Sequence, residues 1–96
     1  MQYINEHLFT LKNIDEIADA LFITKSYLFY LFKTHIKTSP KRYIMEKRLL
    51  AAHEMITQGA KPTHVYEKVG FNDYTSFYRN NTKFFNIPPS EISSNK

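Results

Sequence analysis

A five-residue stretch near the C-terminus, Val69-Gly70-Phe71-Asn72-Asp73, separates two segments whose apolar residues recur at helical spacing. Before it, Pro62 opens a short segment that contains Val65 and Tyr66. After it, the acidic residue of the stretch begins a longer helix that is predicted to reach about residue 85. A short helix, a glycine-containing turn and a longer helix are typical of a helix-turn-helix unit.

The N-terminal half repeats this arrangement. A shift of 48 residues aligns Ile17 with Val65 and Leu21 with Val69. A shift of 49 residues then aligns Leu28 with Phe77, Ile36 with Phe85 and Pro40 with Pro89. The second copy therefore has one additional residue, which falls in the turn. Weak self-similarity is common in helical bundles, but the order of segments favours two copies of one unit.

Capping residues and helix breakers predict the other helices. We expect helices over residues 2–9, over 14–21 after an N-cap at Asn13, and over 25–35 after an N-cap at Thr24. Ser39 and Pro40 start a helix of nearly twenty residues, which Gly59 ends. Pro88 and Pro89 begin a last short turn. The predicted inward-facing side chains are Ile14, Ile17, Ala18, Leu21, Leu28, Leu31, Phe32, His35, Met45, Leu49, Ala52, Met55, Ile56, Phe77, Asn80, Asn81 and Phe84.

The predicted fold is all-α, with about seven helices. We interpret residues 1–96 as a single domain with two helix-turn-helix subdomains, 1–38 and 59–96, joined by a linker helix over 39–58. In a chain of 96 residues each half has only a thin core. The eight Phe and seven Tyr residues supply much of the area that such a core buries.

Composition excludes several classes of function. The chain has no cysteine, so it has neither disulfides nor thiolate metal sites. Its histidines, His7, His35, His53 and His64, have no metal-ligand spacing, and no nucleophile or phosphate-loop motif is present. We predict no catalytic residues, no cofactor and no metal. No apolar run is long enough to cross a membrane and no signal peptide is recognisable, so we expect a cytoplasmic protein with no membrane partner.

The charge is unevenly distributed. The net charge is +4, and residues 1–38 contribute none of it because four lysines balance four acids. The excess of basic residues lies in residues 39–96. This balance is compatible with a polyanionic partner such as double-stranded DNA.

Across nearly its whole length the chain resembles the DNA-binding domain of AraC/XylS-type transcription regulators. The 69–73 stretch carries the resemblance most specifically, together with Phe77, Arg79 and Lys83 at their spacing after it. The remaining matches are Asp15-Glu16-Ile17-Ala18, Ser26-Tyr27-Leu28 with Phe32-Lys33, Ser39-Pro40 with Tyr43-Ile44, Arg48-Leu49 with Ala52, and Pro89-Ser90-Glu91.

Four positions depart from the family pattern. Tyr66 replaces a small alanine, and Asn81 replaces a core phenylalanine. Lys37 and Asn86 occupy two glycine positions, where asparagine tolerates a left-handed backbone better than lysine does. These substitutions affect the packing expected of the second unit.

The resemblance implies two recognition helices that enter successive major grooves of one duplex. It also implies regulation of transcription, with RNA polymerase as a further partner. We expect this segment to be monomeric and to be the C-terminal part of a longer regulator, whose dimerisation, if any, uses an absent N-terminal domain. A stand-alone domain is the alternative.

Seven residues are the candidates for base contact. The resemblance implies Ser26, Phe29 and Tyr30 in the first unit and Arg79 in the second. Tyr74, Thr75 and Tyr78 are added because they share the outward surface of Arg79. Arg79 is suited to guanine O6 and N7. It could instead bind a phosphate or form a surface ion pair, Phe29 could contact a partner protein, and the tyrosines of the second unit could shield the core.

The candidates for phosphate contact are Lys25, Lys33, Lys41, Arg42, Lys61 and Lys83. A solvated surface is the alternative for each of them. A helical protein-interaction module without specific DNA binding is the rival function, and its weak affinity for DNA would depend little on salt. Arg48 is expected to lie towards the inner face of the linker helix, where this helix packs against the rest of the domain.

Overall fold

A computed structural model describes residues 2–92, and within them all regular secondary structure is helical. The α-helices are α1 (Gln2–Glu6), α2 (Ile14–Ala20), α3 (Lys25–Leu31), α4 (Pro40–Thr57), α5 (Pro62–Lys68) and α6 (Tyr74–Phe85). A π-helical turn, η1 (Phe32–Ile36), extends α3, and a 3₁₀ turn, η2 (Pro89–Glu91), follows α6. The all-α prediction with about seven helices is confirmed.

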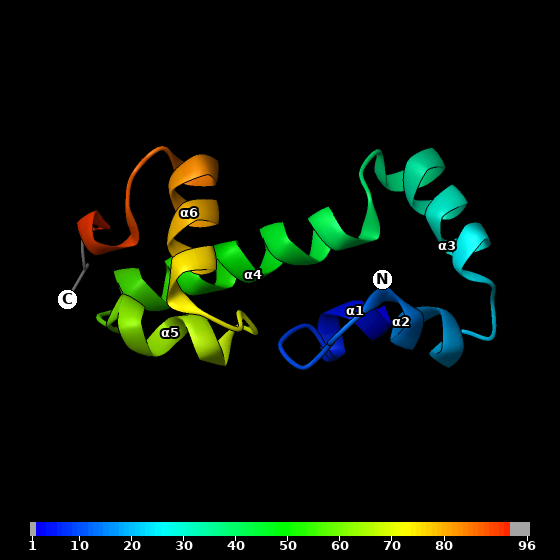
Figure 1. Cartoon of the computed structure of the whole chain (residues 1–96), viewed down its shortest axis with the longest axis horizontal. Helices are drawn as coiled ribbons and strands as arrows, with labels where there is room; N and C mark the ends of the chain where they lie inside the picture. Colours follow the sequence, from blue (N-terminus) through cyan, green and yellow to red (C-terminus); the bar gives the residue numbers. More distant parts are fainter. Residues whose placement is uncertain (1, 93–96) are drawn as a thin grey trace. The chain divides into compact units, whose positions relative to one another are not determined.

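The chain divides into two compact units, unit 1 (Met1–Met45) and unit 2 (Glu46–Lys96). The division falls within α4, so the first turns of this helix belong to unit 1 and the rest belongs to unit 2. Figure 1 shows α1, α2 and α3 in the first unit and α5 and α6 in the second.

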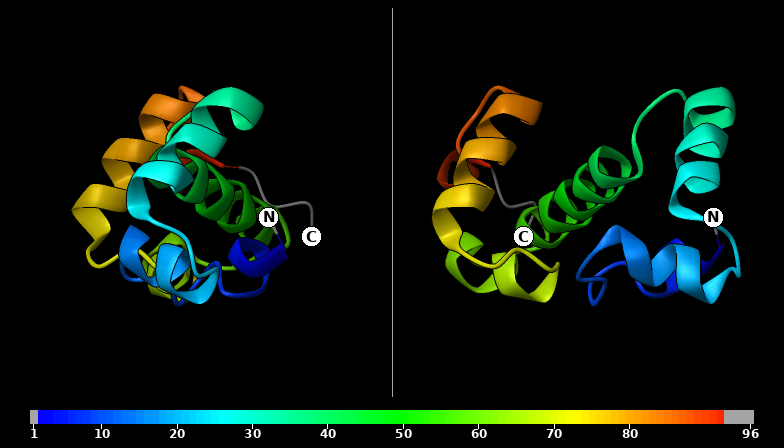
Figure 2. Two further views of the ribbon diagram at one scale, coloured as in Figure 1. Left: turned by 90° about the vertical axis from the view of Figure 1, so that its right-hand side faces the viewer. Right: turned by 45° about the vertical axis from the view of Figure 1, so that its right-hand side comes forward.

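In unit 1, α3 runs across the direction of α2 (Figures 1 and 2). Their contact encloses one apolar cluster. The buried members of this cluster are Ile4, Leu11, Ile17, Ala18, Leu28, Phe32 and Ile44. Tyr43 closes it from α4, with its ring edge against Phe32 at a centroid distance of 5.7 Å. A short helix pair can therefore bury a small continuous core because α4 contributes its first turn.

The predicted N-caps of unit 1 and α4 are confirmed. Asn13 Oδ1, Thr24 Oγ1 and Ser39 Oγ each accept a hydrogen bond from the backbone nitrogen three residues later, at 3.1–3.2 Å. Each bond satisfies one of the N–H groups that a helix start leaves without a partner. Side chains adjacent in sequence thus fix where the helices begin.

Two predictions of burial in unit 1 are wrong. His35 is exposed because η1 winds with wider turns, closed by a 2.8 Å bond from Lys37 N to Phe32 O, and this rotates Ile36 towards the core instead. Leu21 is nearly half exposed because α2 ends one residue before it.

In unit 2, the turn before α6 is fixed to α4. The guanidinium of Arg48 donates a hydrogen bond from Nη1 to the carbonyl oxygen of Gly70 at 3.2 Å, as its predicted inward orientation allows. Burial lowers the pKa of Arg48, which nevertheless stays charged at neutral pH. The buried side chains of this unit are Leu49, Ala52, Ile56, Val65, Val69, Phe77, Asn81, Pro89 and Ile92.

The prediction that Phe84 is buried is wrong. Its side chain is 37% exposed, whereas the neighbouring Phe85 is half-buried. Phe85 stacks on His53 of α4, with ring centroids 4.4 Å apart. Both phenylalanines are one helical turn from the buried Asn81. Because His53 of α4 packs against Phe85, this residue rather than Phe84 is half-buried.

Left-handed backbone marks equivalent positions in the two units. Lys37 and Asn86, which are 49 residues apart, have φ values of 70° and 64° and end their helices. Phe22 and Gly70, which are 48 residues apart, have φ values of 56° and 103°. A phenylalanine in this conformation is strained, and the sequence did not predict it.

The two large departures from the family pattern are both accommodated within unit 2. The ring of Tyr66 packs edge-on against Tyr74, with centroids 5.6 Å apart. Asn81 is fully buried; its Nδ2 donates to the carbonyl oxygen of Ile87 at 3.2 Å, and its Oδ1 has no hydrogen-bond partner. Only one of the two polar groups of this amide therefore has a partner within the protein.

Candidate nucleic-acid interface

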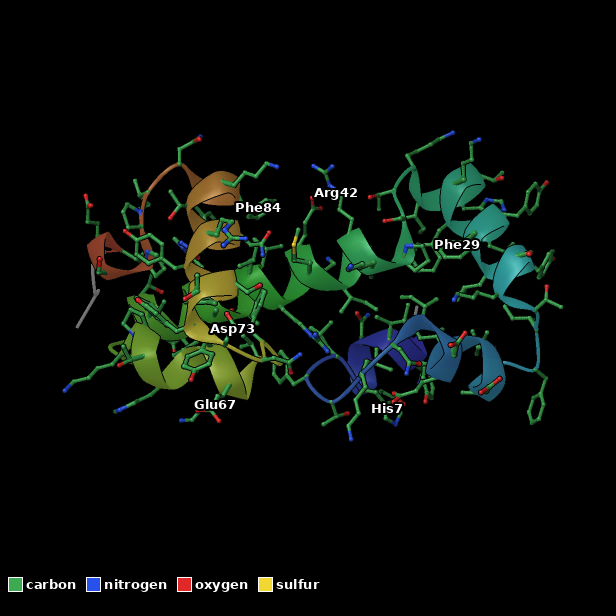
Figure 3. The ribbon with its side chains drawn as sticks, viewed as in Figure 1. His7, Phe29, Arg42, Glu67, Asp73 and Phe84 are labelled. Atoms are coloured by element: carbon green, nitrogen blue, oxygen red, sulfur yellow. The ribbon has the colours of Figure 1, made fainter. Side chains whose placement is uncertain are left out.

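The helix α3, which follows the turn in unit 1, exposes most of its surface. Leu28 and the following Phe32 are buried, and the opposite side carries Ser26, Tyr27 and Tyr30. Of the site residues predicted here, Lys25, Ser26, Phe29, Tyr30 and Lys33 are all exposed. Figure 3 shows Phe29 projecting from α3. The predicted base-contact residues of unit 1 thus lie together on one short helix, accessible from outside.

Tyr27 and Tyr30 form a stacked pair on this surface. Their ring centroids lie 6.1 Å apart, with planes inclined by 19°. The two rings are 50% and 59% exposed. Tyr27 was not among the predicted site residues. The signal that could have identified it is the spacing of three residues, which brings side chains together on a helix.

Lys25 already has an acidic neighbour. Its Nζ lies 3.5 Å from Asp15 Oδ1 of α2, and both side chains are more than half exposed. Such exposed pairs contribute little, about 0–1 kcal/mol, so a phosphate can compete for the lysine. Since Lys25 is the first residue of α3, the ion pair joins the start of this helix to α2.

In unit 2, Asp73 caps α6 and thereby presents the start of this helix. Its Oδ1 accepts a hydrogen bond from Ser76 N at 2.7 Å. Figure 3 shows Asp73 at one end of α6 and Phe84 near the other. The outer side of the helix carries a shallow groove of about 520 Å³. The groove is lined by Tyr74, Thr75, Tyr78, Arg79, Thr82 and Lys83.

The groove brings together all four predicted base-contact residues of unit 2 and one predicted phosphate contact, Lys83. Thr82 is an addition that the sequence analysis did not name; its Oγ1 donates to the carbonyl oxygen of Tyr78 at 2.8 Å. Arg79 is exposed. Arg79 and Lys83 bring positive charge to this side of α6, and Thr75 brings a hydroxyl group.

Tyr74 has a structural role as well. Its ring contacts both Tyr66 and Phe77, with centroids 5.6 Å and 6.0 Å away. Burial, with a smaller contribution from Tyr78, raises the pKa of Tyr74, so its phenol stays protonated at neutral pH. Tyr74 therefore shields the core of unit 2 with one side and lines the groove with the other.

The remaining predicted phosphate contacts are exposed near helix starts. Lys41 and Arg42 lie in the first turn of α4, where Figure 3 shows Arg42 projecting from the helix. Lys61 is the N-cap residue of α5. Helix N-termini attract phosphate through their free N–H groups, and basic side chains there add to this attraction.

Potential metal clusters and membrane-spanning helices are absent among residues 2–92. No three His, Asp or Glu side chains among residues 2–92 come together as a potential metal site. In the same part of the chain, no helix has both the length and the apolar character that a membrane span needs.

Comparison with protein families matches residues 17–95 to a helix-turn-helix domain. The chain belongs to the AraC/XylS family of DNA-binding domains. Its recognition helices are accordingly α3 and α6, the second helix of each helix-turn-helix unit. Proteins of this family bind double-stranded DNA and regulate transcription.

Individual relatives agree with the family. The chain is 28% identical over 89 residues to the probable transcriptional regulator LumQ of Photobacterium leiognathi, covering 92% of this chain and 36% of that protein. It is 34% identical over 88 residues to the uncharacterized HTH-type transcriptional regulator YobQ of Bacillus subtilis, covering 91% and 36%. This AraC/XylS-type chain thus spans about a third of the length of the curated relatives it matches.

The fold of the AraC/XylS-type chain is also found in solved structures. A transcriptional regulator with an AraC-type DNA-binding domain from Chromobacterium violaceum superimposes with a TM-score of 0.85 at 26% identity, covering 95% of this chain and 82% of the other.

Proposed function

We propose that this domain binds a specific sequence in double-stranded DNA through α3 and α6, which enter successive major grooves of one duplex. The observation that carries the proposal is the sign of the charge on the two recognition helices. Neither α3 with η1 nor α6 contains an acidic residue, and their only charged side chains are lysine and arginine. The preceding helix of unit 1, α2, carries three acids and no base.

In this proposal the base contacts are Ser26, Phe29, Tyr30, Tyr74, Thr75, Tyr78 and Arg79. Arg79 recognises a guanine, because a guanidinium can donate two parallel hydrogen bonds to O6 and N7. The groove around it supports this role, since Thr75 and Tyr78 bring hydroxyl groups to the same surface. Residues 39–58 act as the linker between subdomains 1–38 and 59–96.

The phosphate contacts in this proposal are Lys25, Lys33, Lys41, Arg42, Lys61 and Lys83. Six such contacts predict that the logarithm of the affinity falls with the logarithm of the salt concentration with a slope of about −5. This corresponds to a loss of about 10³ in affinity between 50 and 200 mM salt. A protein-interaction module would bind mixed duplex weakly and with almost no dependence on salt.

The test is fluorescence anisotropy at several salt concentrations, after selection of a binding site from random duplexes. Arg79→Ala is expected to weaken binding and to relax the preference at one guanine position by about 1–3 kcal/mol. Arg79→Lys is the matched control: it keeps the charge but loses the planar pair of donors. If Arg79→Ala lowers the affinity but leaves the base preference unchanged, and lysine restores the affinity, Arg79 serves as a phosphate clamp and the base-reading role is wrong.

The wider setting of the domain is also part of the proposal. We infer a monomeric DNA-binding segment in the cytoplasm, without enzymatic activity, acting with RNA polymerase. The relative named as a lactose operon transcription activator in Staphylococcus xylosus, 29% identical over 92 residues, supports a role in transcription. Sedimentation equilibrium of the free chain tests the monomeric state, and a dimer at micromolar concentration contradicts it.

A further inference from the structure

The two recognition helices carry different chemistry at equivalent positions. The 49-residue offset, which also aligns the N-caps Thr24 and Asp73, places Tyr30 where unit 2 has Arg79. It likewise places Ser26 at the position of Thr75, and Phe29 at that of Tyr78. The hydroxyl and the neighbouring aromatic ring are thus repeated, whereas the guanidinium is replaced by a phenol.

The recognition helix of unit 1 lacks the forked side chains that read purines with two parallel hydrogen bonds. Residues 25–36 contain no Arg, Asn or Gln. Guanine is recognised best by the fork of arginine, and adenine by the amide of asparagine or glutamine. The one basic residue at the start of α3, Lys25, faces Asp15 at 3.5 Å.

What unit 1 presents instead is an aromatic ridge, which we define as the stacked pair Tyr27 and Tyr30. Its rings lie 6.1 Å apart and nearly parallel, so each restricts the other's rotation. Both are at least half exposed. The ridge lies away from the buried Leu28 and Phe32, and it includes Tyr30, one of the base contacts in the proposed function.

The major groove offers one apolar group to such a ridge. Every base pair presents hydrogen-bond acceptors there, so a single phenol hydroxyl distinguishes the pairs poorly. The C5-methyl of thymine is the only apolar group on a base edge, and aromatic and aliphatic side chains contact it. Its contact with a ring removes apolar surface of both from water.

We propose that the Tyr27–Tyr30 ridge reads thymine methyl groups, so that the half-site of unit 1 contains thymines and requires no guanine. The half-site of unit 2 contains the guanine read by Arg79. This inference rests on the proposed function, because it requires α3 to enter the major groove. It adds Tyr27 to the residues that determine specificity.

The test replaces thymine by deoxyuridine, one position at a time, in the selected binding site. Deoxyuridine keeps every hydrogen-bonding group and lacks only the methyl. Each thymine that the ridge contacts is expected to give about a four-fold loss of affinity on replacement, which is what burial of one methyl-sized group contributes. Replacements in flanking DNA are expected to leave the affinity unchanged.

Variants of the two ridge tyrosines test whether their rings cause the difference in affinity between thymine and deoxyuridine. Tyr30→Ala and Tyr27→Ala are expected to reduce affinity for thymine-containing DNA and to abolish the difference between thymine and deoxyuridine. Tyr30→Phe is the matched control, because it keeps the ring and removes the hydroxyl, and it is expected to retain that difference. Arg79→Ala is expected to retain it too. Circular dichroism checks that each variant is folded, as expected for half-exposed side chains.

The outcomes separate this inference from the function on which it depends. If a site is selected but deoxyuridine has no effect, if Tyr30→Phe behaves like Tyr30→Ala, or if the half-site of unit 1 requires a guanine, the ridge does not read methyl groups and DNA binding stands. If no duplex is bound with salt dependence, the proposed function fails and this inference fails with it.

Discussion

Replacement of Gly70 by alanine tests how unit 2 holds its turn. Two features make this position sensitive. The backbone φ is +103°, where side-chain-bearing residues are rarely found. A Cβ added here would also lie 2.7 Å from both Cζ and Nε of Arg48, which is closer than real Cβ atoms approach. The guanidinium must therefore move away, although it is the group that donates to the Gly70 carbonyl oxygen.

The expected loss of stability has two parts, backbone strain and a broken hydrogen bond. The backbone strain of alanine at this φ amounts to about 1–2 kcal/mol. Displacement of the guanidinium breaks a hydrogen bond from a charged donor, worth about 1.5–3 kcal/mol, and the partial exposure of Arg48 puts the loss at the lower end of that range. We therefore expect Gly70→Ala to lower the free energy of unfolding by about 2–4 kcal/mol.

The assay is urea unfolding monitored by circular dichroism. For each variant the slope of the free energy of unfolding against urea concentration is compared with that of the native protein. At a slope of about 2 kcal/mol/M, the predicted loss lowers the midpoint by roughly 1–2 M. A second measurement in an Arg48→Met background separates the two parts, because methionine keeps an unbranched side chain and lacks the guanidinium. There Gly70→Ala is expected to cost only the backbone part, about 1–2 kcal/mol.

Two results would refute this reasoning. A loss below about 1 kcal/mol in the native background would show that the turn tolerates a side chain. An equal loss in both backgrounds would show that Arg48 and Gly70 are not coupled, and that the bond between them contributes nothing to stability.

Substitutions at three further positions test other local features, the first two positions by the same urea assay. Phe22→Gly should stabilise the protein by about 0.5–1 kcal/mol, because relief of left-handed strain exceeds the chain entropy of glycine and the 94% exposed ring buries nothing; a loss of stability contradicts this. Asn81→Leu should raise the free energy of unfolding by about 1 kcal/mol, because it removes the Oδ1 that has no partner. The isosteric Asn81→Asp should lower the free energy of unfolding by more than about 2 kcal/mol, because it buries a charge. Equal effects of the two substitutions would exclude burial of a polar group as the cause. Asp73→Ala should cost about 1 kcal/mol and Asp73→Asn much less, as measured by thermal unfolding; an intact melting temperature in the alanine variant would mean that the cap does not stabilise α6.

The sequence predicted best what neighbouring residues determine. The predicted N-caps Asn13, Thr24 and Ser39 are confirmed, since a short polar side chain reaches the backbone N–H three residues on whatever the rest of the fold does. Asp73, predicted only to begin a helix, caps it in the same way. The left-handed ends of η1 and α6 were likewise expected from the family pattern. These features need no knowledge of tertiary packing.

What the sequence did not predict depends on geometry beyond the helical period. His35 was expected to be buried because a spacing of 3.6 residues was assumed throughout, and the π-helical turn breaks that spacing. Phe84 and Phe85 are both compatible with the buried face of α6, and the contact with His53 on another helix chooses Phe85. Phe22 lies where the second copy of the repeat has Gly70. Left-handed backbone is usually recognised by a glycine, so a phenylalanine at this position did not by itself predict the positive φ.

The candidate site was predicted where it depends on the helical period and missed where it depends on contacts between side chains. The exposed faces of α3 and α6 follow from the helical period once the buried residues are known, and all four predicted base-contact residues of unit 2 line one groove. Tyr27 was missed because its relevance comes from stacking with Tyr30 rather than from its own position in a motif.

Hydroxyl-radical footprinting of the complex with its selected site tests the central claim most directly. If both units read the same duplex, two protected stretches are expected on one face of the DNA, with centres one helical turn of about 10–10.5 base pairs apart. Arg79→Ala should weaken protection of one stretch more than the other. A single protected stretch, or two whose centres lie on opposite faces of the duplex, would contradict the account.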